Sequence, residues 1–199
     1  MFANTATTDS SYDENKMRVC ILFGSPRKEG NTAKLLDAFF EASPENIAFD
    51  TFSAFQLNAQ PCDDCGYCKT KEACIKHDLD DFCDKLEKAD VFVIATPIYL
   101  MNFPSPVKAV LDRFQRYYNA RFFLKKRLPI EKPKRAFFFA TSGADDNEKS
   151  FEFMKNQLVT SFSVMNTRLT DCYLAQGLDN ISIENDLEKI RELSKSIFN

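Results

Sequence analysis

The chain has 199 residues, of which 44% are hydrophobic, enough to fill the core of one domain but few for two. Its formal net charge of −3 gives no indication of nucleic-acid binding. It contains no apolar run long enough to cross a bilayer, and residues 1–16 are too polar for a signal peptide. We therefore expect a cytoplasmic protein without a membrane partner, with a tail at 1–16 and one domain at 17–199. In a reducing compartment its seven cysteines are expected to be thiols or ligands rather than disulfides.

Hydrophobic periodicity predicts five strands that alternate with helices. In chain order we expect a strand at 17–23, a helix at 33–40, an edge strand at 47–53, a helix at 79–86, a strand at 91–96, a helix at 107–114, a strand at 135–141, a helix at 151–165, an edge strand at 167–175 and a helix at 187–197. This alternation is typical of a doubly wound α/β fold with a parallel sheet. Ligands of such sheets bind beyond the carboxyl ends of the strands, where the strand order reverses. The loops after the first, third and fourth strands are therefore the candidate site.

The loop after the first strand, GSPRKEGNT at 24–32, has the features of a phosphate site. The N-terminus of the helix predicted to follow offers unpaired N–H groups and a positive dipole end to an anion. Ser25, Asn31 and Thr32 add side-chain donors, and Arg27 adds a positive charge. The spacing is neither that of a Walker A loop nor that of G-x-G-x-x-G. A plain loop capped by Asn31 or Thr32 is the competing interpretation.

The other two loops suit a planar ligand. Residues 97–104 combine aromatic and apolar side chains with polar backbone, as a flavin ring with its amide-like edge would require, although such a loop could also simply plug the end of the sheet. The fourth strand is followed by small polar residues fit for backbone contacts. The occurrence of all three loops at the expected edge favours a bound ligand over three separate coincidences.

Two of these motifs, GSPRKEGNT and PIYLMNFPSPVKAVLDRF at 97–114, resemble the NAD(P)H-dependent FMN reductase and iron–sulfur flavoprotein family, over residues 17 to about 175. The resemblance implies a flavodoxin-like three-layer α/β sandwich, a five-stranded parallel sheet of order 2-1-3-4-5, and FMN with NAD(P)H as electron donor. It also implies a homodimer or homotetramer with the flavin near the subunit interface. The implied FMN contacts are Ser25, Arg27, Asn31 and Thr32 at the phosphate, Pro97, Ile98, Tyr99, Leu100 and Asn102 on one side of the ring, and Thr141, Ser142 and Gly143 on the other.

Assembly can also be inferred from the residues themselves. The apolar run Leu100, Met101, Phe103 and Pro104 stands at a sheet end, where a monomer would expose it to water. We therefore expect the segment 101–106 to meet a neighbouring subunit.

A run of four cysteines, Cys62, Cys65, Cys68 and Cys74, lies between the second strand and the next helix. The first three have ferredoxin spacing, but the fourth comes later and lacks the following proline. Zinc fits less well, because it usually takes two separated Cys-x2-Cys pairs. The same spacing resembles that of iron–sulfur flavoproteins and also that of family members without a cluster. A [4Fe-4S] cluster and free or redox-active thiols therefore both stay open. Cys20, Cys83 and Cys172 are expected to be core residues.

Two further features have a structural and a functional interpretation. His77, the only histidine, is expected as a surface or capping residue, and the competing interpretation is a ligand or catalytic base. Asp78 can cap the helix that begins at Leu79. Residues 121–135 are strongly basic in an acidic chain, and they form either a solvated lip or a dock for an NADPH phosphate or an acidic electron-carrier protein.

The leading hypothesis is an FMN-dependent oxidoreductase that takes electrons from NAD(P)H and passes them to a small-molecule, flavin or protein acceptor. The flavin would supply the chemistry, so no catalytic acid or base is nominated. The alternatives are an iron–sulfur flavoprotein that carries electrons with a four-cysteine cluster beside FMN, and a flavin-binding or thiol-sensing protein without enzymatic activity. No sequence motif selects NADH or NADPH.

Overall fold

The computed structural model describes residues 16–198, so the expected tail at 1–16 lies outside the described residues apart from Lys16. The strands form one parallel sheet of order β2-β1-β3-β4-β5, which confirms the predicted fold class. Their bounds are β1 Met17–Phe23, β2 Ile47–Ser53, β3 Val91–Pro97, β4 Lys134–Thr141 and β5 Thr167–Ala175. The three central strands are almost wholly buried, as their continuous apolar runs predict.

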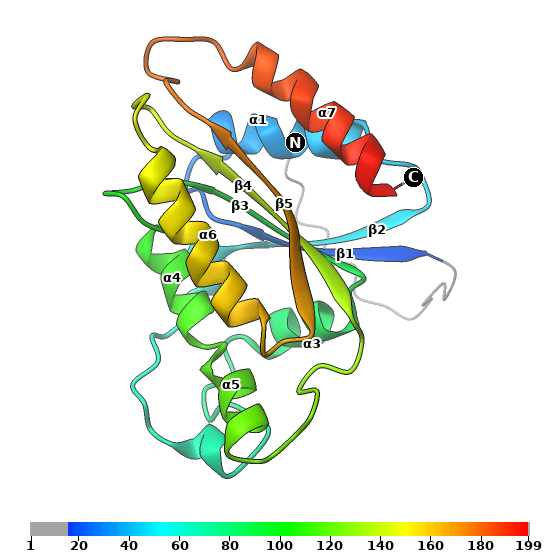
Figure 1. The fold of residues 1–199 in the computed structure, drawn as a ribbon, viewed down its shortest axis with the longest axis vertical. Coiled ribbons are helices and arrows are strands. Elements are labelled where there is room, and N and C mark those ends of the chain that lie inside the picture. The colour runs from blue at the N-terminus through cyan, green and yellow to red at the C-terminus, as the bar shows by residue number, and fades with distance from the viewer. Residues whose placement is uncertain (1–15, 199) are drawn as a thin grey trace.

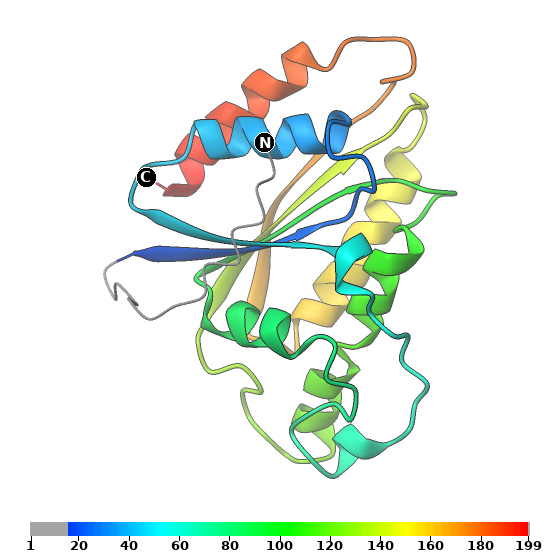
Figure 2. The same cartoon turned by 180° about the vertical axis from the view of Figure 1, so that it is seen from behind.

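Helices cover both faces of the sheet (Figures 1 and 2). Their bounds are α1 Asn31–Glu41, α2 Ala54–Leu57, α3 Asp80–Lys88, α4 Ser105–Asp112, α5 Gln115–Phe122, α6 Glu148–Phe162 and α7 Glu184–Phe198, with a 3-10 turn η1 at Tyr67–Lys69. Helices α1 and α7 pack together on one face, and α3, α4 and α6 lie on the other. Within residues 16–198, every helix is too short or too polar to serve as a membrane span.

Each face of the sheet has its own hydrophobic core, and phenylalanine dominates both. On the α1 and α7 face, Phe39 packs against Phe139 and Phe198 with ring centroids 5.6 and 5.7 Å apart. On the other face, Phe92 lies at the centre of a group that reaches into α6 through Phe162. Cys20 and Cys83 are fully or nearly fully buried there, as predicted, and burial raises the pKa of both thiols.

The chain differs from the sequence prediction mainly in the segment after α4. No helix was expected between the one at 107–114 and the strand at 135–141, but Gln115–Phe122 form α5, which packs against η1. Tyr117, Asn119 and Ala120 form its buried side. In Figures 1 and 2, α5 and the loop that carries η1 lie at the opposite end of the molecule's long axis from α1 and α7.

Candidate functional site

The loops after β1, β3 and β4 lie side by side, because backbone pairing continues past the strand ends. The N–H of Gly24 donates to the carbonyl of Ala95 at 2.7 Å. The N–H of Ile98 donates in turn to the carbonyl of Thr141 at 2.8 Å. The carboxyl edge of the sheet is therefore one continuous surface to which all three predicted loops contribute.

The first loop ends in an open helix N-terminus. Gly30 is the N-cap of α1, no side chain within residues 16–198 caps the helix, and its first turn contains no acidic residue. Capping by Asn31 or Thr32, the competing interpretation, is not what the structure shows. The first N–H groups of α1 are thus left for an anion, as a phosphate site requires.

The four residues predicted at the phosphate differ in exposure. Ser25 and Thr32 are buried, Asn31 is half-buried and Arg27 is exposed. The hydroxyl of Ser25 accepts from the N–H of Arg27 at 3.2 Å, which folds the loop back toward the helix. The hydroxyls of Thr32 and Thr141 lie 2.7 Å apart in a buried hydrogen bond. This bond joins the start of α1 to the end of β4 and so couples the first and third loops.

Gly24 is required by close packing at the end of β1. A Cβ atom added there would lie 2.5 Å from both Oγ1 of Thr96 and Cγ2 of Val107. The Thr96 hydroxyl in turn donates to the carbonyl of Gly24 at 3.4 Å. The first loop is therefore pressed against β3 and α4, which brings its backbone close to the site.

The loop after β3 is a tight turn with two strained residues at its tip. Tyr99 and Asn102 exchange two backbone hydrogen bonds of 2.9 Å, while Leu100 and Met101 have positive φ angles of 45° and 65°. Neither residue is glycine, so this conformation is costly, and such strain is typical of functional sites. Leu100 is 100% exposed and Met101 64% exposed. The turn presents an apolar tip to the solvent, while Pro97 and Ile98 behind it are buried and half-buried.

One expectation for this loop is wrong. Phe103 and Pro104 were predicted to be exposed beside Leu100 and Met101, but both are buried. Phe103 packs against Phe138 of β4, with ring centroids 5.7 Å apart, because the turn directs it back into the core. The exposed apolar surface is therefore smaller than expected. Asn102 faces inward too, since its Oδ1 accepts from the N–H of Phe103 and from Gln157.

The loop after β4 is held by its own hydrogen bonds. The Ser142 hydroxyl donates to the carbonyl of Ala144 at 3.0 Å and accepts from Nδ2 of Asn147 at 2.8 Å. Gly143 lies under the Asp179 carboxylate, so closely that an added Cβ would collide with it. Thr141, Ser142 and Gly143 thus form a fixed wall beside the other two loops.

The four clustered cysteines line one small cavity of about 20 Å³. Cys62 and Cys65 are exposed, whereas Cys68 and Cys74 are half-buried. Gly66, at φ +77°, makes the turn between Cys65 and η1. Within the described residues, no three of these thiols are placed as ligands of a single ion. Four cysteines are nevertheless the donor set that an iron–sulfur cluster takes, and all four line this one cavity together with Lys76, Arg113 and Arg116.

A buried arginine closes the cysteine loop at its base. The guanidinium of Arg113, directly after α4, is 4% exposed. Its Nη1 donates to the carbonyl of Gln60 at 3.0 Å, and its Nη2 donates to the carbonyl of Lys76 at 2.7 Å. Nη1 also lies 2.9 Å from Oδ1 of Asp78. Both ends of the loop are therefore held by one side chain, a contact that the sequence motifs did not indicate.

Asp78 pairs with Arg113 at the base of the cysteine loop, whereas we expected it to cap α3. The N-cap of α3 is Leu79, and none of the side chains that the structure describes caps that helix. Burial alone would raise the pKa of Asp78, but the N–H of Gln60, 2.7 Å from its Oδ2, and the Arg113 guanidinium outweigh burial and lower this pKa. His77 is exposed, as predicted, and its Nδ1 lies 2.7 Å from Oδ2 of Asp80.

A second buried polar residue, also missed by the sequence patterns, reaches the cysteine loop from α5. Asn119 is 1% exposed, and its Nδ2 lies 3.1 Å from Sγ of Cys68. Within residues 16–198, Oδ1 of Asn119 and Nε of Arg113 are buried without hydrogen-bond partners. An asparagine in a basic, aromatic segment carries no sequence signal for such a role.

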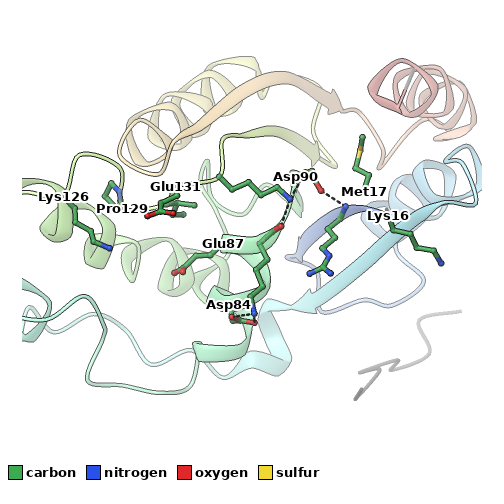
Figure 3. Close-up of a pocket in the computed structure, with 12 residues that line it drawn as sticks. Lys16, Met17, Asp84, Glu87, Asp90, Lys126, Pro129 and Glu131 are labelled. Atoms are coloured by element: carbon green, nitrogen blue, oxygen red, sulfur yellow. Dashed lines mark hydrogen bonds and ion pairs between the residues drawn. The ribbon is translucent and has the colours of Figure 1, made fainter. Parts of the chain in front are cut away.

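A second cavity, of about 790 Å³, lies at the opposite edge of the sheet (Figure 3). It is bounded by Met17 at the start of β1 and by Asp90 just before β3. Asp90 accepts from the N–H of Arg18 at 2.9 Å and pairs with Lys132 at 2.8 Å. Because it lies at the amino ends of the strands, it is not the predicted ligand site.

The basic segment 121–135 does not form a uniform patch. Arg121 donates to the carbonyl of Arg127, and Lys126 pairs with Glu72 of the cysteine loop. Lys134 is buried, and Arg135 donates to the carbonyl of Ile197. Much of this positive charge is therefore used within the chain, which weakens the interpretation as a broad dock.

Comparisons with known proteins agree with this geometry. A family model described as NADPH-dependent FMN reductase matches residues 17–169. The chain is 34% identical over 115 residues to an iron-sulfur flavoprotein of Methanosarcina thermophila, covering 56% of this chain and 60% of that protein. It is 33% identical over 106 residues to an iron-sulfur flavoprotein of Archaeoglobus fulgidus, covering 51% and 47%. The matched region thus spans about half to three-fifths of these relatives.

Solved structures share the fold at low sequence identity. An NAD(P)H:quinone oxidoreductase from Methanothermobacter marburgensis has a TM-score of 0.72 at 16% identity, covering 92% of this chain and 97% of that one. An FMN-dependent NADH-azoreductase from Bacillus anthracis, in complex with FMN, has a TM-score of 0.64 at 14% identity, covering 92% and 100%. These similarities support the fold assignment.

Proposed function

We propose that this chain, which belongs to the NADPH-dependent FMN reductase family, is an FMN-dependent oxidoreductase that passes electrons from NAD(P)H to a small-molecule, flavin or protein acceptor. The observation that carries the proposal is the continuous surface formed by the loops after β1, β3 and β4, with the uncapped end of α1 at one side. When bound there, FMN would supply the hydride and electron transfer.

The residues present fit FMN, and each loop has a separate task. Ser25, Asn31 and Thr32 would hold the phosphate with the first N–H groups of α1, and Arg27 would add charge from the exposed side. Thr32 can donate to a phosphate oxygen while it accepts from Thr141, because a hydroxyl has one donor and two acceptor sites.

The other two loops would hold the ring. The turn after β3, with Pro97, Ile98, Tyr99, Leu100 and Asn102, would cover one side of the flavin and exclude water. Thr141, Ser142 and Gly143 would form the other side, fixed by Asn147.

The test of this assignment is flavin binding. Purified protein should be yellow and release FMN, not FAD, because the site offers one phosphate cradle. Thr32→Val should weaken FMN binding by about 1–3 kcal/mol, since a buried charged acceptor loses a donor. Thr51→Val, an exposed threonine on edge strand β2, is the matched control and should bind FMN like the wild type. If Thr32→Val binds FMN as tightly as the wild type, the phosphate site is assigned wrongly. If FMN-replete protein oxidises NAD(P)H only slowly in the steady state, the proposed oxidoreductase activity is refuted.

A second candidate function is an electron-carrying iron–sulfur flavoprotein. Two observations favour it. The four cysteines line one cavity together with the buried Arg113, and the two relatives described above are named iron-sulfur flavoproteins. Cys62, Cys65, Cys68 and Cys74 would hold the cluster, which would supply one-electron storage.

Iron content distinguishes the two candidates. Protein made and purified without oxygen should contain close to four iron and four sulfide per chain, by analogy with four-cysteine cubane clusters. Alanine at any of the four cysteines should lose the iron and keep FMN, whereas Cys83→Ala should keep both, because Cys83 is buried in the core. If the anaerobic protein contains no iron and oxidises NAD(P)H rapidly, the iron–sulfur candidate is refuted and the reductase without a cluster is retained.

For assembly we keep the dimer or tetramer as a proposal, with Tyr99, Leu100 and Met101 as the contact. These exposed apolar side chains stand at the edge of the flavin site, where a second subunit would cover them. Light scattering at micromolar concentration tests it, and a monomer would contradict it.

A further inference from the structure

The side-chain amide of Asn119 contacts the sulfur atom of Cys68. It lies on the buried side of α5 with 1% exposure, and its Nδ2 is 3.1 Å from Sγ of Cys68. A buried amide usually satisfies its donors and its acceptor, yet Oδ1 of Asn119 has no hydrogen-bond partner within residues 16–198. In the part of the chain that the structure describes, the hydrogen bond of this buried amide is therefore directed at one cysteine.

Cys68 is also the cysteine nearest to a rigid element. It lies within η1, which packs against α5, whereas Cys62 and Cys65 are exposed on the loop. Among the four thiols, in the part of the chain that the structure describes, Cys68 alone has a side-chain N–H donor. Arg113 fixes the two ends of the loop through backbone carbonyls, so Asn119 supplies the contact that fixes its middle.

An amide N–H can donate only to a sulfur that accepts. A thiolate or an iron-bound sulfur is a better acceptor than a protonated thiol. A hydrogen bond to a cluster sulfur also stabilises the more negative, reduced cluster and thereby raises its reduction potential.

We propose that Asn119 is the positioning residue for Cys68: its amide anchors the Cys68 sulfur to α5, and in the cluster-loaded protein it raises the reduction potential. The second half of this proposal rests on the iron–sulfur candidate described above. The first half concerns the loop itself and holds with or without iron.

The test uses Asn119→Leu, which has nearly the same shape but no donor. Its control is Tyr117→Phe, which removes a different buried hydrogen bond on α5, that from the Tyr117 hydroxyl to Glu87 at 2.9 Å, and leaves Cys68 untouched. Both variants lose one buried polar contact on the same helix, so a general loosening of α5 would affect both alike.

The first readout is alkylation of the metal-free full-length protein by iodoacetamide at about pH 10, above the usual thiol pKa of about 8.5, so that the rate reports how freely the sulfur reacts and not how much of it is ionised; the products are quantified by mass spectrometry. The ratio of the Cys68 rate to the Cys62 rate should rise at least about threefold in Asn119→Leu, as the loss of one hydrogen bond predicts, and stay at the wild-type value in Tyr117→Phe. An unchanged ratio in Asn119→Leu, or an equal rise in both variants, would overturn the anchoring role.

The second readout is the midpoint potential of the anaerobically loaded protein. It should be lower in Asn119→Leu than in the wild type and in Tyr117→Phe, where a tenfold change in the one-electron equilibrium corresponds to about 59 mV. An unshifted potential would overturn the tuning role. If the wild type binds no iron, the cluster candidate and the tuning role both fail, and the alkylation ratio alone still decides whether Asn119 anchors Cys68.

Discussion

Replacing Arg113 by leucine should be among the most destabilising single changes outside the sheet. The guanidinium side chain is 4% exposed and the Asp78 side chain 15% exposed, so the substitution leaves a mostly buried carboxylate without its cation. Breaking a buried ion pair costs about 3–5 kcal/mol. Asp78 keeps the N–H of Gln60, and the carbonyls of Gln60 and Lys76 can turn to water, so we expect the lower end, about 3 kcal/mol.

Urea unfolding followed by circular dichroism measures this loss. With a slope of about 2 kcal/mol per molar urea, the midpoint should fall by about 1.5 M. A domain of ordinary stability would remain folded in water. The double variant Arg113→Leu with Asp78→Asn should be more stable than the sum of the single losses predicts, because the unpaired charge is gone. A midpoint shift below about 0.3 M, or strictly additive losses, would refute the closure of the loop by Arg113.

Three further predictions concern other parts of the chain. Burial lowers the pKa of Lys134 to about 8, against about 10.4 when unfolded, so this lysine contributes stability that rises with pH across that window. The buried thiols of Cys20 and Cys83, whose pKa values are raised, contribute stability that falls with pH above about 8.5. Lys134→Met should therefore give the plot of unfolding free energy against pH a more negative slope between pH 8 and 10 than in the wild type, and an unchanged slope would contradict the burial of this ammonium group. Gly24→Ala should lower the unfolding free energy by about 1–3 kcal/mol, because its Cβ collides with Thr96, and thermal melting that shows no loss would contradict this packing. Met101→Gly should raise stability by about 1 kcal/mol in urea unfolding by relieving the positive φ angle, and a loss of stability would contradict this strain.

Most of the fold could be predicted from the sequence because each buried strand has a continuous apolar run. The bounds of β1, β2 and β5 agree with the prediction, and those of β3 and β4 differ by one residue. Helix α5 was missed because its buried side includes Tyr117 and Asn119 among charged neighbours, a pattern without the usual apolar stripe. Tertiary contact with η1, and not local sequence, favours this helix.

The candidate site was predictable to the level of loops but not of contacts. Short motifs indicated the three loops at the sheet edge, since the fold itself brings strand ends together. The hydrogen bond between Thr32 and Thr141 joins residues 109 apart in sequence, and that between Asn119 and Cys68 joins residues 51 apart. Contacts of this kind depend on how the elements pack, and no local pattern encodes them.

Helix α4 has a consequence for electron transfer, because its length helps to set the distance between the two candidate redox groups. The turn after β3 leads directly into the first residue of α4, Ser105. Its last residue, Asp112, is followed by Arg113, which donates hydrogen bonds to the cysteine loop. Its eight residues rise about 12 Å, so the chain's own geometry sets a fixed offset between the groups. A longer α4 would increase this offset by about 1.5 Å for each added residue and should slow electron exchange between the two groups.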